Sequence, residues 1–169
     1  MLITPALVRT GREFNDVESI LDFLSDLAVK QGFAGSKAAV LSGFKLREQE
    51  GTTGMVEGFA IPHSQSETIR EAKIAVLKNR ADRPIQWESL DGQPIYTVIA
   101  LYIPSVQVKA QHLKLLSKIA VLLMDSEFKN FLKTTDDPKL IATKINDVAG
   151  IESEVAGGKT NPISNERTL

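Results

Sequence analysis

The sequence predicts an α/β fold, a single-domain sandwich in which a mixed β-sheet is flanked by helices. Apolar residues recur at helical spacing near the start of the chain and again after residue 108. The middle of the chain instead has short apolar segments typical of strands. Asp91 and Gly92 form a turn between two of these segments, which favours a hairpin-like connection and therefore a mixed sheet. The length of 169 residues suits one domain.

Two helices are expected before the first strand. Each follows residues whose side chains can cap a helix: Asn15 or Asp16 for the first, and Ser36 for the second. The first should end at Gly32 and the second at about Glu48, which puts Arg47 near the C-terminal end of a helix. Beyond it, Gly51-Thr52-Thr53-Gly54 breaks the helical pattern.

Three strands are expected in the middle of the chain, at residues 56–61, 73–78 and 97–103. Pro62 closes the first strand, so that His63 follows its end. The third strand is almost entirely apolar and is therefore expected at the centre of the sheet. Ile85 and Trp87 favour a further short strand between the second and the third.

Three helices are expected after the strands. The first should span residues 108–124 with a wide apolar stripe, as in a helix that lies on a sheet. Ser126 is the expected cap of the next, and Asp136 or Asp137 that of the last. Pro138 then occupies the first helical position, where its missing N–H costs nothing.

The expected domain spans residues 1–149, and residues 150–169 are expected to be a flexible tail or linker. Those last residues are rich in Gly, Ser, Asn and Glu and contain few large apolar side chains. The longest apolar run, Val98 to Ile103, is far shorter than the ~20 residues that a spanning helix needs. The N-terminus also lacks the charged start and apolar middle of a signal peptide. We therefore expect a soluble, cytoplasmic protein without direct membrane insertion.

Composition excludes some chemistries. The chain has 20 basic and 21 acidic residues, a net charge of −1, which argues against nucleic-acid binding as the main function. It has no cysteine, which excludes thiol chemistry and fits a reducing compartment. The neutral imidazole of histidine is the nucleophile best matched to neutral pH among the remaining side chains.

The chain has two histidines, His63 and His112. His63 follows a proline at the end of a short apolar segment, where α/β folds commonly display reactive groups. A structural histidine bonded to a nearby carbonyl is the alternative. His112 begins an amphipathic helix, where the dipole favours the neutral ring, and it can equally be part of the helix's buried face. Two histidines without a matched carboxylate motif give little support for a metal site.

Arg47 is one basic residue among many, and a solvated surface charge is its simplest interpretation. Its place before Gly51-Thr52-Thr53-Gly54 and the Gly58–His63 segment suggests another. An arginine, loop amides and hydroxyls, and a histidine together suit a phosphoryl group, which carries a charge of ~−2. No Gly-Lys-Ser/Thr follows the loop, so nucleotide binding is unsupported.

These residues also resemble a known family signature. The matching segments are Leu46-Arg47-Glu48-Gln49-Glu50-Gly51-Thr52-Thr53-Gly54, Gly58-Phe59-Ala60-Ile61-Pro62-His63, Trp87 with Leu90-Asp91-Gly92-Gln93-Pro94, and His112-Leu113-Lys114-Leu115-Leu116-Ser117-Lys118-Ile119-Ala120. Together they resemble type 2 EIIA domains, from the fructose/mannitol branch of the bacterial phosphoenolpyruvate-dependent sugar phosphotransferase system (PTS). The resemblance covers roughly residues 10–148.

The resemblance implies a site and partners. His63 matches the histidine that takes a phosphoryl group from the phosphohistidine of the carrier HPr and passes it to a cysteine of an EIIB partner. That partner serves the membrane component EIIC, and a fructose-type sugar is expected. Arg47 and His112 match the residues that flank the acceptor. The implied reaction uses no cofactor and no metal.

Two alternatives remain open at this point. A nitrogen-related regulatory EIIA has the same fold and the same histidine, but it signals through binding partners. Trp87 and the Asp91-Gly92 turn suit the sugar branch somewhat better. In a non-catalytic binding domain, both histidines would instead be structural.

Overall fold

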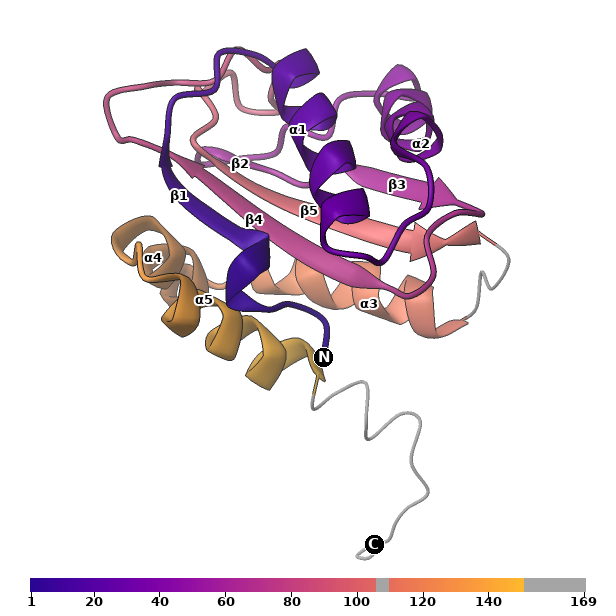
Figure 1. The fold of residues 1–169 in the computed structure, drawn as a ribbon. Helices are drawn as coiled ribbons and strands as arrows, with labels where there is room; N and C mark the ends of the chain where they lie inside the picture. The colour runs from indigo at the N-terminus through magenta and orange to yellow at the C-terminus, as the bar shows by residue number, and fades with distance from the viewer. Residues whose placement is uncertain (106–109, 151–169) are drawn as a thin grey trace, which may run out of the picture.

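The helices and strands lie in three layers, with a mixed β-sheet between two groups of helices (Figure 1). The computed structural model describes residues 1–105 and 110–150, except the side chains of residues 110–113, 116 and 150. The strands are β1 (Val8–Arg12), β2 (Phe59–Ala60), β3 (His63–Ser66), β4 (Lys73–Asn79) and β5 (Thr97–Pro104). The α-helices are α1 (Val17–Lys30), α2 (Lys37–Gln49), α3 (Ala110–Leu122), α4 (Ser126–Thr134) and α5 (Pro138–Ile145). A 3₁₀ turn, η1 (Pro5–Leu7), precedes β1, and a π-helical turn, η3 (Asn146–Gly150), follows α5.

The sheet confirms the predicted mixture of directions. Its order is β1-β4-β5-β2, and β3 also pairs with β5. β4 runs antiparallel to β5, while β1 is parallel to β4 and both β2 and β3 are parallel to β5. All eight residues of β5 are buried, as expected for the central strand. The predicted α/β sandwich is therefore confirmed.

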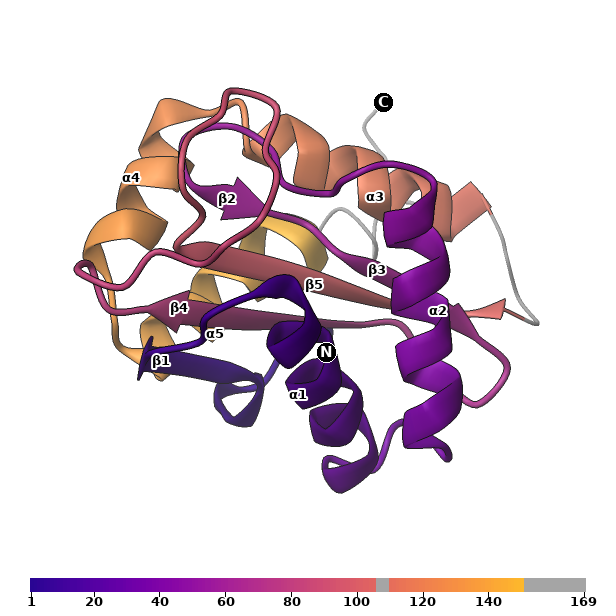
Figure 2. The ribbon, with the colours of Figure 1, turned by 90° about the horizontal axis from the view of Figure 1, so that it is seen from above.

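Helices α1 and α2 cover one face of the sheet, and α3, α4 and α5 cover the other (Figures 1 and 2). Buried Tyr102 of β5 anchors the first face, because its hydroxyl donates to the Leu24 carbonyl of α1 at 2.7 Å. The rings of Phe33, in the segment after α1, and Phe44 of α2 pack edge-on against Tyr102, so α2 is also joined to the centre of the sheet.

Most helix caps are those that the sequence predicts. The side chains of Asp16, Ser36 and Asp137 each accept a hydrogen bond from a backbone N–H in the first turn of their helices. The prediction for α4 was wrong by one position. Asp125 is its cap and Ser126 its first residue, since the Asp125 carboxylate accepts from the Glu127 N–H at 3.1 Å.

Three strand predictions need correction. β1 was not predicted, because this short edge strand carries two arginines and a glycine and only Val8 is buried. The predicted strand at 56–61 begins only at Phe59, since Glu57 and Gly58 have φ of 56° and 87°, which no extended strand allows. Ile85 and Trp87 are buried but lie in a loop, where Ile85 forms one isolated bridge with Ile95.

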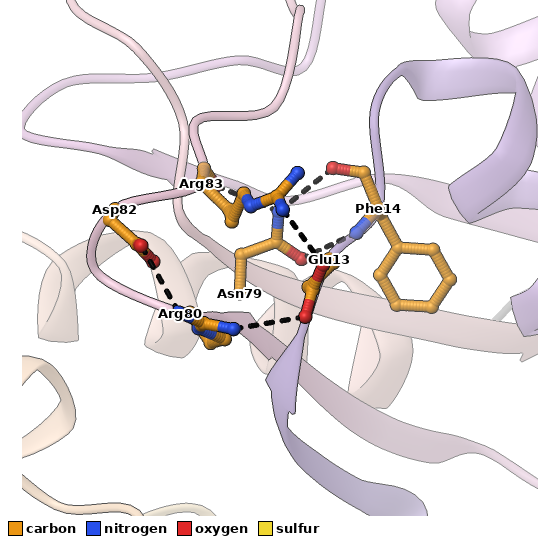
Figure 3. Close-up of polar contacts among 6 residues, drawn as sticks. All are labelled: Glu13, Phe14, Asn79, Arg80, Asp82 and Arg83. Carbon is orange, nitrogen blue, oxygen red and sulfur yellow. Dashed lines mark hydrogen bonds and ion pairs between the residues drawn. The ribbon is translucent and has the colours of Figure 1, made fainter.

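The connection between β4 and β5 is fixed at its start by a polar cluster (Figure 3). Asn79 bonds to both backbone groups of Phe14, accepting from its N–H at 3.0 Å and donating to its carbonyl at 2.8 Å. Glu13 binds Arg80 and Arg83, one with each carboxylate oxygen. These contacts tie the chain after β4 to the segment between β1 and α1.

Candidate active site

His63 lies on an outer strand of the sheet that is interrupted just before it. β2 and β3 both pair with β5, and their register is the same on both sides of the gap: Phe59 pairs with Thr97, Ala60 with Val98, and His63 with Leu101. The Pro62 carbonyl still accepts from the Leu101 N–H at 2.9 Å. His63 therefore begins β3, whereas the sequence predicted it just beyond the end of a strand.

The alternation of side chains along this strand places His63 on a definite face. Ser64 points to the face covered by α2, because its buried hydroxyl donates to the Val40 carbonyl at 2.7 Å. Phe59 lies below Lys133 of α4, at 5.9 Å from its Nζ to the ring centroid. His63 is one residue from Ser64 and four from Phe59, so it shares the face of Phe59. This face is the one that α3 and α4 cover.

The environment of His63 keeps its imidazole neutral. Burial, and after it the positive charge of Arg47, lower its pKa from 6.5 to about 4. The backbone of Ile61 acts on the ring in the opposite direction, but less strongly. Nδ1 is buried and has no hydrogen-bond partner of regular geometry among the described residues, although the residue as a whole is only half-buried. Near pH 7 the ring is therefore uncharged and has lone-pair electrons available.

Arg47 reaches this site from the last turn of α2. Its Nη1 donates to the Gly51 carbonyl at 2.8 Å. Among the described residues it has no carboxylate partner. One turn earlier, Gly43 lets α2 lie directly on β3, since a Cβ there would come within 2.3 Å of Ser64 Oγ and 2.8 Å of the Gln65 carbonyl oxygen. This contact fixes α2, and with it Arg47, beside the start of β3.

The structure thus brings together two of the three predicted site residues. His112 belongs to α3, but its side chain lies outside the described residues, so its place in the site stays a prediction. The predicted tail, residues 150–169, also lies outside them, apart from the backbone of Gly150.

Sequence reasoning missed a polar contact beside Arg47. Both oxygens of Glu48 bind Thr53: Oε1 accepts from its N–H at 3.2 Å, and Oε2 accepts from its hydroxyl. Thr53 is only 1% exposed. The family motif included Glu48 beside Arg47 and the Thr-Thr-Gly loop, but it gave neither Glu48 nor Thr53 a role.

The rest of this loop packs against residues 88–89. The Thr52 hydroxyl donates to the Glu88 carbonyl at 2.6 Å and accepts from the Gly54 N–H at 3.1 Å. Gly54 lies so close to residues 88–89 that a Cβ would come within 2.2 Å of the Glu88 carbonyl oxygen. The loop therefore has a fixed shape at the edge of the site.

The described residues contain neither a metal-binding cluster nor a membrane-spanning helix. Within residues 1–105 and 110–150, no group of three or more His, Asp or Glu side chains could hold a metal ion. None of the helices in those ranges is long and apolar enough to cross a membrane.

Comparison with known proteins identifies the family. Residues 1–148 match the model of the family described as "Phosphoenolpyruvate-dependent sugar phosphotransferase system, EIIA 2". The chain belongs to this family, as the resemblance of its motifs implied.

Curated relatives include both regulatory and sugar-specific proteins. The nitrogen regulatory protein of Bradyrhizobium diazoefficiens is 34% identical over 140 residues, which cover 83% of this chain and 89% of the relative. The 2-O-alpha-mannosyl-D-glycerate-specific EIIABC component of Escherichia coli is 27% identical over 140 residues, or 82% of this chain. The match spans only 21% of that longer protein.

Solved structures share the fold. The nitrogen regulatory protein IIA-Ntr of Neisseria meningitidis superimposes with a TM-score of 0.75 at 23% identity, covering 83% of this chain and 93% of that one. The mannitol IIA enzyme of Escherichia coli, solved in complex with phosphorylated IIB, gives a TM-score of 0.66 at 15% identity. There the match covers 88% of this chain and 97% of the other.

Proposed function

We propose that this chain is a cytoplasmic phosphoryl-transfer component of a bacterial sugar phosphotransferase system and that His63 carries the phosphoryl group. The observation that supports this most directly is the half-buried, neutral imidazole of His63 beside the Arg47 guanidinium. A lowered pKa keeps the ring nucleophilic at neutral pH, and the cation offsets the charge that arrives.

In the proposed reaction, His63 attacks the phosphorus of a phosphohistidine on the carrier HPr. A new N–P bond forms on His63 while the donor's N–P bond breaks, so the phosphoryl group changes rings without an added reactant. A cysteine thiolate of an EIIB partner then attacks the same phosphorus and frees His63. Such transfers depend mainly on positioning and charge stabilisation, which a small rigid site can supply.

We assign the attacking role to Nε2 of His63, because Nδ1 is buried. The ring reacts through one nitrogen while the other keeps its proton, and the Ile61 backbone beside the ring is the candidate acceptor for that proton. Arg47 would bind the equatorial oxygens of the transferring group through its planar set of donors. His112, from α3, would add a neighbouring hydrogen bond.

The proposed partners are HPr as donor and EIIB as acceptor, in a pathway that ends at the membrane component EIIC. The mannitol IIA structure, whose fold this chain shares, was solved with phosphorylated IIB, which supports an EIIB partner. We propose a fructose-type sugar as the transported substrate. Because both partners must use the same face in turn, each interface should be weak and transient.

A second candidate function is regulatory. The 34% identity with a nitrogen regulatory protein favours a role in which phosphorylation of His63 controls binding to a target protein. The acceptor residue is the same in both candidates, and only the fate of the phosphoryl group differs.

Incubation with phosphoenolpyruvate, Enzyme I and HPr tests the shared step. We expect acid-labile phosphate on the wild-type chain and none on His63→Ala, with both proteins folded by circular dichroism. Labelling that is absent from wild type, or unchanged in His63→Ala, would disprove the proposal. Adding a purified EIIB then separates the two candidates, because the transport role requires the label to move to its cysteine.

A further inference from the structure

A continuous set of polar contacts leads from the end of α2 to the proposed acceptor. Glu48 binds the backbone N–H and the hydroxyl of Thr53. The Thr53 carbonyl in turn accepts from the Ile61 N–H at 3.0 Å. Ile61 is two residues before His63, and its backbone also acts on the His63 ring. The side chain of Glu48 is thus linked, through one buried threonine, to the segment that holds the imidazole.

The same contacts decide where the negative charge of Glu48 lies. Glu48 follows Arg47 directly in the last turn of α2, yet the two do not form an ion pair. Both carboxylate oxygens are occupied by Thr53 instead. Arg47 therefore keeps guanidinium donors for an incoming anion, and the carboxylate is kept away from the place where a second negative group would arrive.

We propose that Glu48 and Thr53 are positioning residues for phosphoryl transfer, an inference that rests on the proposed role of His63. Thr53 holds the Glu48 carboxylate so that it neither pairs with Arg47 nor repels the phosphoryl group. Glu48 in return holds the loop that fixes Ile61 and thereby the start of β3. Neither side chain needs to touch the phosphoryl group for this role.

Substitutions at these two residues should have unequal effects. In Thr53→Val, one oxygen of Glu48 loses its donor, and the freed carboxylate can turn toward the neighbouring Arg47. In Glu48→Gln, the amide can still accept from the Thr53 N–H and can donate to the Thr53 hydroxyl, so the contact survives without its charge. We therefore expect phosphoryl transfer to slow by at least about tenfold in Thr53→Val. The loss in Glu48→Gln should be about threefold.

The double variant provides the decisive measurement. Combining Glu48→Gln with Thr53→Val removes the negative charge that Thr53→Val alone would free to pair with Arg47. The rate of transfer should therefore recover to within about threefold of that of Glu48→Gln alone. A purely structural role predicts the opposite, because the double variant loses more contacts than either single variant. A double variant no faster than Thr53→Val would overturn the proposal.

Two further readouts separate positioning from folding or docking. With phospho-HPr as donor, kcat should fall in Thr53→Val while KM stays near the wild-type value. The His63 pKa, followed by NMR, should rise in Thr53→Val, because the freed Glu48 carboxylate would offset the charge of Arg47. In the double variant the His63 pKa should return to the wild-type value. An unchanged His63 pKa in folded Thr53→Val would contradict the release of Glu48.

Ser25→Ala is the matched control for loss of a buried hydroxyl. Ser25 is fully buried in α1, and its hydroxyl donates to the Leu21 carbonyl at 2.7 Å. This variant should transfer at the wild-type rate. If wild type is labelled on His63 but Thr53→Val matches its rate, the positioning role fails while the proposed function stands. If wild type is not labelled at all, the proposed function itself fails.

Discussion

Lys78 and His63 both lie on the sheet and are both withdrawn from water, but their polar surroundings are opposite. Lys78 is 5% exposed, and its ammonium donates to the carbonyls of Leu132 and Thr135 and to the Asp136 carboxylate. All three of its donors therefore have acceptors. His63 is less deeply buried, yet its Nδ1 has no regular partner and its pKa is lowered to about 4.

The difference separates a structural cation from the proposed phosphoryl acceptor. Lys78 joins β4 to the carbonyls at the end of α4, which stabilise its charge. The surroundings of His63 disfavour its charged form and leave the neutral ring with unused bonding capacity. Burial alone does not identify a reactive group; at His63 it is combined with a lowered pKa and an unpaired ring nitrogen.

Among variants that test the contrast between His63 and Lys78, Arg47→Ala should have the largest effect. Removing the guanidinium should slow phosphorylation of His63 about 100-fold, equivalent to about 2.7 kcal/mol of barrier. It should also raise the His63 pKa, because the Arg47 charge lowers it. Rapid-quench kinetics with phospho-HPr and NMR titration would measure the two changes. A folded variant with an unaltered rate would remove Arg47 from the site.

Lys78→Met should show the opposite pattern. The carbonyls of Leu132 and Thr135 would lose a charged donor, so the free energy of unfolding should fall by about 2 kcal/mol while phosphoryl transfer stays unchanged. Urea denaturation measures the first quantity. The exposed Lys139, whose side chain has no polar contact among the described residues, offers the control Lys139→Met, which should be near neutral. Slower phosphoryl transfer in folded Lys78→Met would show that Lys78 is not purely structural.

The smallest expected effect is a pH dependence that belongs to His63. Its pKa in the folded chain, about 4, lies below the unfolded value near 6.5, so the unfolded state binds more protons between these values. Stability from the neutral ring is therefore present above pH 6.5 and is lost as the pH falls toward 4. Wild type should lose about 1 to 2 kcal/mol more than His63→Ala between pH 7 and 4.5, measured by denaturation. Parallel curves for the two proteins would contradict the lowered pKa.

The sequence predicted features that local residues determine. Cap residues and apolar periodicity give α1, α2 and α5, because a cap bonds within the first turn of its own helix. The motifs also predicted His63 and Arg47 as site residues, although the sequence alone could not place them side by side. Their proximity depends on how α2 lies on β3 at Gly43, a contact between segments about twenty residues apart.

Other features depend on distant partners and left no local signal. β1 forms only because β4 offers an edge to pair with, which its own polar residues do not reveal. Glu48 looks like any charged residue at the end of a helix until the loop folds back and brings Thr53 to it. Trp87, whose alternation with Ile85 suggested a strand, is buried by loop packing instead.

The unchanged register across the gap at Ile61 and Pro62 limits how this family member can vary in length. Replacing either residue leaves the count intact, and His63 still emerges on the face shared with Phe59. Gain or loss of a single residue would instead turn His63 toward α2 and bring a neighbouring residue into its place. At this gap, insertions and deletions should therefore be far more costly than substitutions, because the spacing itself determines which side chain lies on the face of Phe59.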